Sequence, residues 1–198
     1  MKNLFLFFSL VLAWQLSGQE TPALKEFNQE RQALTRTGML VLGGWAISNM
    51  SVSGLSLATG SFDQRPAVRS FHQMNLGWNA VNLAIASFGY FGSQTDPSSL
   101  SLAGSLQAQE SIQRTLLFNA GLDLAYMAGG AYLLERAKTS QKPARDRGFG
   151  RAVILNGAFL FVFDAILFWL HHRRSDSLYE WLPQIQAGAQ QVGLVWRW

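Results

Sequence analysis

The chain has 198 residues, of which 48% are hydrophobic and 14% charged, and its formal net charge is +4 at pH 7. It has no cysteine, which excludes disulfide bonds, thiol catalysis and cysteine-based metal or iron–sulfur sites. The mean hydropathy of +0.08 is only mildly apolar, so the placement of the charges decides the class of protein better than the averages do.

Residues 1–19 have the order of parts found in a secretory signal peptide. Lys2 precedes an apolar run that ends at Trp14, and small residues follow this run. The run is short for a membrane-spanning anchor. We therefore predict cleavage near Gly18 or Gln19, which leaves the mature N-terminus outside the cytoplasm.

Four later stretches of the chain are almost free of charge. Among all Asp, Glu, Lys and Arg residues, only Asp123 and Asp164 fall within them. Each stretch is close to the roughly 20 residues that cross a bilayer core of about 30 Å. A soluble bundle would place charges along the outer face of every helix. We therefore predict four membrane spans, at about 37–59, 70–92, 115–134 and 152–172.

Two polar segments beside the spans have helical patterns. Leu24, Phe27 and Leu34 recur at helical spacing and predict a short surface helix that leads into the first span. Asp96 and Pro97 are typical of an N-cap and a first helical residue, so a second helix should begin there and run into the third span.

The basic residues of the loops predict the orientation of the spans. The first loop carries Arg65 and Arg69, whereas the second carries Arg114 as its one basic residue. The third loop carries six basic residues: Arg136, Lys138, Lys142, Arg145, Arg147 and Arg151. Cytoplasmic loops are the basic ones, so we expect the first and third loops inside and both chain termini outside. Arg173 and Arg174 at the outer end of the fourth span oppose this arrangement.

The same third loop explains the high pI of about 9.8 without a nucleic-acid partner. An orientation signal is the preferred interpretation of its charge. Binding of anionic lipid headgroups is the alternative, and it would use Arg136, Lys138, Lys142, Arg145 and Arg147. A membrane-protein partner or a second copy of the chain is a further candidate for an interaction within the bilayer.

Each predicted span carries polar residues that we expect to turn inward. In the second span, His72, Asn75, Asn79 and Asn82 are three or four residues apart, which holds one helical face. The candidate intramembrane polar cluster contains Asn49, Asn79, Asn82, Asn119, Asp123, Asn156 and Asp164.

Asp123 and Asp164 each lie eight residues from the outer end of their span. Both carboxyls should therefore sit roughly 12 Å below the outer boundary, at one depth. Two interpretations remain open. The two acids hold a proton or a cation between them, or a hydrogen-bonded lock with asparagine joins the helices, which is the preferred one.

Small residues predict where helices approach closely. Gly121, Ala125 and Gly129 recur every four residues in the third span, and Ala80 and Ala84 do so in the second. We expect these residues to serve packing inside the bundle rather than a dimer contact.

The histidines do not predict a cofactor or metal site. His72 begins the second span at the inner surface, whereas His171 and His172 end the fourth at the outer one. They are about a membrane apart, so they cannot ligate one haem iron, and we expect them at the interfaces. No nucleophile–base pair or metal triad lies at a compatible depth, so the sequence predicts neither a catalytic site nor a cofactor.

The segments FHQMNLGWNAVN, LFNAGLDLAY and NGAFLFVFDAILFWLHH, together with the leader, carry a family resemblance. On them the chain resembles a family of small bacterial four-span membrane proteins of unknown function, over about residues 20–175. The resemblance implies four helices and no assigned activity.

The predicted fold is all-α: a four-transmembrane-helix bundle over residues 20–175, with a signal peptide before it and an extracytoplasmic tail at 176–198. Val192, Leu194, Trp196 and Trp198 alternate in this tail, which predicts a β-hairpin or a disordered end. We expect a multi-pass protein of the bacterial inner membrane. The preferred function is a non-enzymatic helical membrane module, and the alternative is a small proton- or cation-coupled carrier that uses Asp123 and Asp164.

Overall fold

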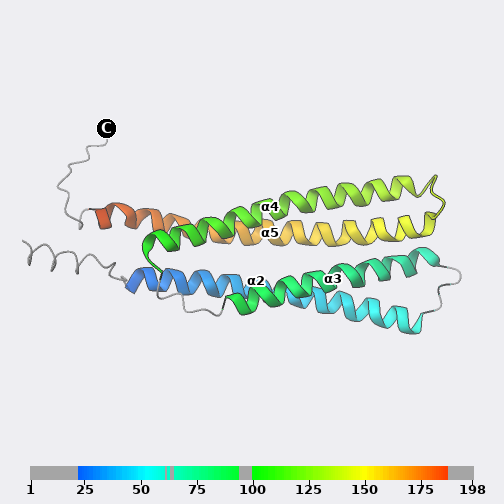
Figure 1. The fold of residues 1–198 in the computed structure, drawn as a ribbon, viewed down its shortest axis with the longest axis horizontal. Helices are drawn as coiled ribbons and strands as arrows, with labels where there is room; N and C mark the ends of the chain where they lie inside the picture. The colour runs from blue at the N-terminus through cyan, green and yellow to red at the C-terminus, as the bar shows by residue number, and fades with distance from the viewer. Residues whose placement is uncertain (1–21, 61, 63–64, 94–99, 187–198) are drawn as a thin grey trace, which may run out of the picture.

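The computed structural model describes residues 22–60, 62, 65–93 and 100–186. These residues form four α-helices and no strand: α2 (Pro22–Thr59), α3 (Pro66–Gly92), α4 (Leu102–Arg136) and α5 (Pro143–Gln186). The helices run up and down along one long axis (Figure 1). The all-α prediction is confirmed, while the leader and the alternating residues of the tail lie outside the described residues.

The helices begin where the local sequence favours a first turn. Pro22, Pro66 and Pro143 each open a helix, at the position where proline loses no hydrogen bond. α4 begins instead after Ser101, whose side chain accepts a hydrogen bond of 3.2 Å from the Gly104 backbone N–H. The predicted start at Asp96 and Pro97 lies outside the described residues, within which Leu100 and Ser101 are not helical and α4 begins at Leu102.

The bundle has two ends that differ in chemistry. We call the end where α2 begins and α5 finishes the terminal end, and the opposite end, with the α2–α3 and α4–α5 connections, the basic end (Figure 1). Three helices extend past the predicted spans at the terminal end. Leu24 and Phe27 of α2 are buried there against Leu102 and Leu106 of α4, so the first part of α2 is helical as predicted but packs within the bundle.

The helices pack in the order α2, α3, α5, α4. α2 packs along α3, α3 along α5, and α5 along α4. Over the full lengths of the two helices, no Cα atom of α3 lies within 8 Å of a Cα atom of α4. The backbones of these two helices therefore do not approach each other closely.

α4 and α5 approach each other through glycines. A Cβ atom on Gly130 would lie 2.8 Å from the Gly150 carbonyl oxygen, and one on Gly150 would lie 2.7 Å from the Gly130 carbonyl oxygen. A Cβ atom on Gly121 or Gly129 would meet nothing within 4 Å. The predicted internal role of Gly121, Ala125 and Gly129, and of Ala80 and Ala84, is therefore wrong, since all five are exposed on the outer faces of α4 and α3.

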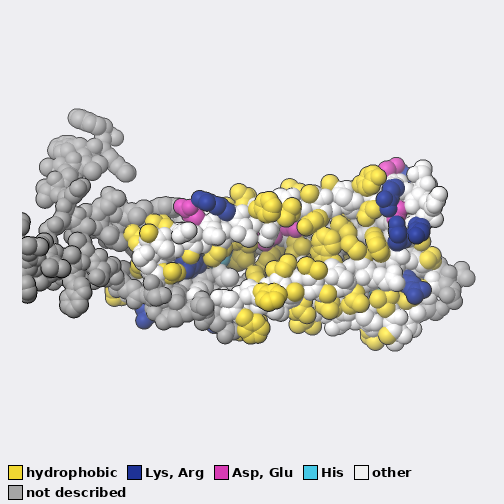
Figure 2. Space-filling model, viewed as in Figure 1, with side chains coloured by type: hydrophobic (Ala, Val, Ile, Leu, Met, Phe, Trp, Pro, Cys, Tyr) yellow, Lys and Arg dark blue, Asp and Glu magenta, His cyan; other side chains and the backbone are white. Residues whose placement is uncertain are grey.

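Apolar side chains cover the outside of the bundle and polar ones fill its inside. Phe88 is 81% exposed and Phe118 is 67% exposed, whereas Asn79 and Asn156 are fully buried. Figure 2 shows the hydrophobic side chains along the middle of the bundle, with Lys and Arg near its two ends. This distribution is the reverse of that in a soluble protein. Two helices, α2 and α5, are long and apolar enough to cross a membrane.

Candidate functional site

Asn156 of α5 is the centre of a buried amide network that joins three helices. Its side-chain NH2 donates to Asn75 Oδ1 at 2.8 Å. Its Oδ1 accepts from Asn79 Nδ2 at 2.9 Å and from Trp45 Nε1 at 3.3 Å. Asparagine carries both donors and an acceptor, so one residue of α5 is bonded to α2 and α3 together.

The network continues toward the basic end between α2 and α3. Asn75 Nδ2 donates to Asn49 Oδ1 at 3.1 Å and to Ser53 Oγ at 2.9 Å. His72 Nδ1 lies 3.3 Å from the same Ser53 hydroxyl. Asn82 Nδ2 donates weakly to Asn79 Oδ1 at 3.4 Å at the other end of the network. The face shared by His72, Asn75, Asn79 and Asn82 thus points into the bundle.

The two acids lie together beyond this network. Asp123 of α4 is 3% exposed and Asp164 of α5 is 5% exposed. Their carboxyl groups interact directly, side chain to side chain. Of the seven residues of the predicted cluster, Asn49, Asn79 and Asn156 lie in the amide network, and Asn119, Asp123 and Asp164 lie around a cavity. Asn82 belongs to both.

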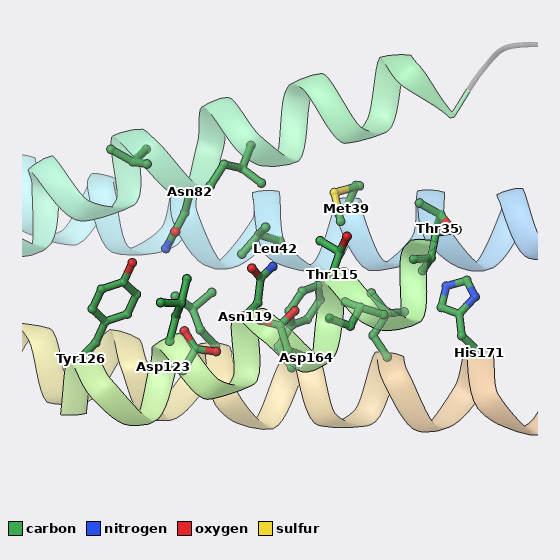
Figure 3. A pocket seen from close by; sticks show the side chains of 18 of the residues that line it. Thr35, Met39, Leu42, Asn82, Thr115, Asn119, Asp123, Tyr126, Asp164 and His171 are labelled. Carbon is green, nitrogen blue, oxygen red and sulfur yellow. The ribbon is translucent and has the colours of Figure 1, made fainter. Parts of the chain in front are cut away.

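This cavity has a volume of about 550 Å³ and is lined by all four helices. Figure 3 shows Asp123, Asp164 and Asn119 on one side of it, with Asn82 on the other. The rest of the lining is largely apolar, and Met39 and Leu42 of α2 form part of it. A mostly apolar cavity with a few convergent polar groups is the usual form of a small-molecule site.

Several buried polar atoms at the cavity have no hydrogen-bond partner within the described part of the chain. They are Oδ2 of Asp123 and both ring nitrogens of His171. His171 is fully buried and lies at the terminal end of the cavity (Figure 3). Buried polar groups are nearly always paired, so these atoms indicate room for a bound group or water.

We expected His171 at the membrane interface, and within the bundle its side chain is fully buried between the helices. α5 continues past His171 to Gln186, and Gln109 Nε2 of α4 donates to the His171 carbonyl at 2.6 Å and to Ser175 Oγ at 3.1 Å. The spacing of seven residues from Asp164, which places both side chains on one face of α5, was the signal that could have identified it.

The cavity opens to the outside between α3 and α4. Val81 and Ile85 line it and are 60% and 53% exposed, so they form its rim on α3. The rings of Trp78 and Tyr126 meet edge to face with centroids 4.9 Å apart and join the two helices on the side toward the basic end. Figure 2 shows a hollow between these helices with acidic side chains at it.

The basic end contains an ion pair between a partly exposed arginine and a buried aspartate. Arg136 donates to the Asp146 carboxylate through Nε at 3.0 Å and through Nη2 at 2.8 Å. This guanidinium lowers the pKa of Asp146 to about 2. Arg145 also lies 3.5 Å from Asp146, and Lys138 pairs with Glu135. Acidic neighbours therefore offset part of the charge of the basic loop.

No metal centre is formed by the described residues, which contain no group of three or more His, Asp or Glu side chains that could hold an ion. The structure also places His72 and His171 at opposite ends of the amide network and the cavity. The two histidine side chains are therefore too far apart to bind one ion.

Comparison with known proteins gives a family but no activity. Residues 41–165 match DUF6992, a family of unknown function. The match covers more than half of the chain, and the chain belongs to this family. It includes the amide network and both acids, and it ends before His171. No curated protein and no solved structure matches the chain.

Proposed function

We propose that this DUF6992 member is a multi-pass protein of a bacterial inner membrane, in which all four helices cross the bilayer. The observation that carries the proposal is the reversed distribution of side chains. Leu117 and Trp169 are among the large apolar residues that are more than half exposed, while asparagine, aspartate and histidine are buried. In lipid the apolar surface is solvated and the polar groups must find partners inside.

The polar content of α3 and α4 is consistent with this proposal. Their polar residues lower the average hydropathy, but Asn75, Asn79, Asn82 and Asp123 all point into the bundle. The surfaces that would face lipid, at Ile85 and Leu124 for example, are apolar. A helix needs an apolar outer face, and not an apolar average, when its polar side chains are bonded within the protein.

Within the membrane, the bundle is a non-enzymatic module with two internal parts. The amide network around Asn156 locks α2, α3 and α5 together, because its side chains bond one another and are buried. The cavity at Asp123 and Asp164 is the functional part. The hydroxyls of Thr35 and Thr115 in its lining donate to backbone carbonyls of their own helices, and the ring nitrogens of His171 have no hydrogen-bond partner among the described residues. Binding is therefore a better explanation than catalysis.

A proton- or cation-coupled carrier is the second candidate. Two observations favour it: the carboxyls of Asp123 and Asp164 interact in a cavity, and one Asp123 oxygen has no partner among the described residues. Two like charges in an apolar site require a proton or a cation between them. Flux measured in proteoliposomes, with protons and a panel of cations, separates a carrier from a binding module.

The membrane proposal itself is tested by extraction and by orientation. The chain should stay in the membrane pellet after carbonate washing. A reporter that is active only outside the cytoplasm should be active when fused after Trp198, and inactive when fused at Ser140. Release by carbonate would contradict the proposal, and activity of a cytoplasm-specific reporter after Trp198 would reverse the orientation.

The basic end supports a minor proposal about lipid. Arg147 and Lys142 are exposed beside the partly neutralised residues Arg136, Arg145 and Lys138. Each favourably placed basic residue adds about 1 kcal/mol of attraction to an anionic membrane. We therefore expect this end to prefer phosphatidylglycerol over neutral lipid. Equal association with both lipids would leave an orientation signal as the role of the loop.

A further inference from the structure

We propose that the cavity binds a single-chain amphiphile with a protonated amine, which enters from the bilayer between α3 and α4 and places its ammonium group at Asp123 and Asp164. This inference rests on the proposed membrane location, since the opening must face lipid for an amphiphile to enter by that route.

The charge of the lining selects the head group. The ionisable side chains that line the cavity are Asp123, Asp164, Tyr126 and His171, and no lysine or arginine is among the lining residues. An ammonium group supplies the counter-ion that two buried carboxyls require. A carboxylate or phosphate would instead add a third negative charge to the same site.

The hydrogen-bonding groups also match an amine. A primary ammonium has three donors and no acceptor. Asp123 offers Oδ2, which has no partner within the described part of the chain, and the Asp164 carboxyl and Asn119 lie beside it on the same side of the cavity (Figure 3). Acceptors therefore converge where the head group would lie.

The shape of the cavity suits one extended apolar chain. Its lining on α4 runs from Ser111 to Tyr126, which is about 22 Å of helix at a rise of 1.5 Å per residue. Leu116 lies on this stretch, and Leu167 of α5 lies across from it on the way to His171. An alkyl chain can thus lie against apolar walls while its head group stays at the acids.

The opening provides the route. The backbones of α3 and α4 stay apart, Trp78 and Tyr126 close only the side toward the basic end, and the rim residues Val81 and Ile85 are exposed on the surface that would contact lipid. An amphiphile in the bilayer could reach the carboxyls without crossing water. Its ammonium would lose hydration only as it gains the two acids, which limits the cost of placing a charge at that depth.

The test uses radiolabelled dodecylamine and the full-length protein in nanodiscs of phosphatidylcholine, with empty nanodiscs subtracted. We expect saturable binding of one dodecylamine per chain at pH 7. The affinity for dodecanol should be lower by on the order of tenfold or more, since dodecanol lacks the charge. Dodecanoate should not compete with dodecylamine for the site. Equal binding of dodecylamine and dodecanol would overturn the proposal, as would the absence of saturable binding.

Two pairs of variants locate the site. Asp123→Asn and Asp164→Asn should each weaken dodecylamine binding by on the order of tenfold or more, because the buried ammonium group loses one of its two carboxyl partners. Val81→Trp should obstruct the rim and slow association, whereas Val162→Trp, on the outer face of α5 and away from the lining, should leave it unchanged. Unchanged binding in both aspartate variants would contradict the site.

The failure of the inference can be told apart from that of the proposed function. A chain that resists carbonate extraction but does not bind dodecylamine would remain a membrane protein with a different ligand. A chain that carbonate releases would refute the membrane location, and with it the lateral route, whatever the binding result.

Discussion

Asn79 on α3 and Asn156 on α5, which are 77 residues apart in sequence, are joined by a side-chain hydrogen bond of 2.9 Å in the centre of the bundle. Both residues are fully buried. The bond links two helices that are not neighbours in the chain, and with the bond of 2.8 Å from Asn156 to Asn75 it joins the α2–α3 hairpin to the α4–α5 hairpin.

We expect Asn156→Leu to destabilise the protein by about 1 to 3 kcal/mol, because it leaves amide groups of Asn75 and Asn79 without their partner in an apolar interior. Thermal unfolding in detergent measures the change. Leu155→Ala, at the adjacent exposed position, is the control and should cost little. If the two variants unfold at the same temperature, the amide network does not lock the helices.

Asp164 should distinguish a hydrogen-bonding role from an ionic one. Asp164→Asn keeps a donor and an acceptor beside Asp123, so its unfolding temperature should be close to that of the wild type. Asp164→Leu removes both and should cost on the order of 1 to 3 kcal/mol. A leucine variant as stable as the wild type would show that the two acids do not stabilise the fold.

The sequence predicted the helices well where a physical pattern was present. Charge-free stretches and the three- and four-residue spacing of His72, Asn75, Asn79 and Asn82 identified the helices and an inward face, because burying a polar group requires a partner. The convergence of Asp123 and Asp164 followed from counting residues along antiparallel helices. Whether the two carboxyls touch depends on side-chain packing, which cannot be predicted by counting residues along the helices.

The errors have a common cause. Helix ends and contacts in polar segments leave no hydropathy signal, so the extension of α5 to Gln186 and the burial of His171 were missed. Glycine spacing was equally ambiguous. Gly129 and Gly130 are adjacent, yet only Gly130 faces α5, and neighbours on a helix differ by about 100° in direction.

The adjacent glycines Gly129 and Gly130 give a matched test of the α4–α5 contact. In Gly130→Ala the new Cβ atom would lie 2.7 Å from Ile154 Cγ1 and 2.8 Å from the Gly150 carbonyl oxygen, so the helices must separate at a cost of about 1 to 3 kcal/mol. Gly129→Ala meets nothing within 4 Å and should stabilise the helix by up to about 1 kcal/mol. Equal unfolding temperatures would contradict the packing described for α4 and α5.

The ion pair at the basic end predicts a dependence of stability on pH. Arg136 holds the pKa of Asp146 at about 2 in the folded protein, below its ordinary value of 3.8. A lowered pKa contributes stability that is present above pH 4 and is lost as the pH falls through about 2. The difference in unfolding temperature between pH 5 and pH 2 should therefore be smaller in Asp146→Asn than in the wild type. An identical difference in both proteins would show that the pair does not stabilise the fold.

The absence of cysteine from the chain permits the most direct test of the central claim, that all four helices cross a membrane. Single cysteines at Ala103, Ser140 and Val162 are treated with a membrane-impermeant maleimide in intact and in permeabilised cells. Ala103→Cys should react in intact cells, Ser140→Cys only after permeabilisation, and Val162→Cys, which is more than half exposed on α5, in neither condition because lipid covers it. Reaction of Val162→Cys in permeabilised cells as fast as that of Ser140→Cys would show that water surrounds the apolar face, and would contradict a membrane-spanning bundle.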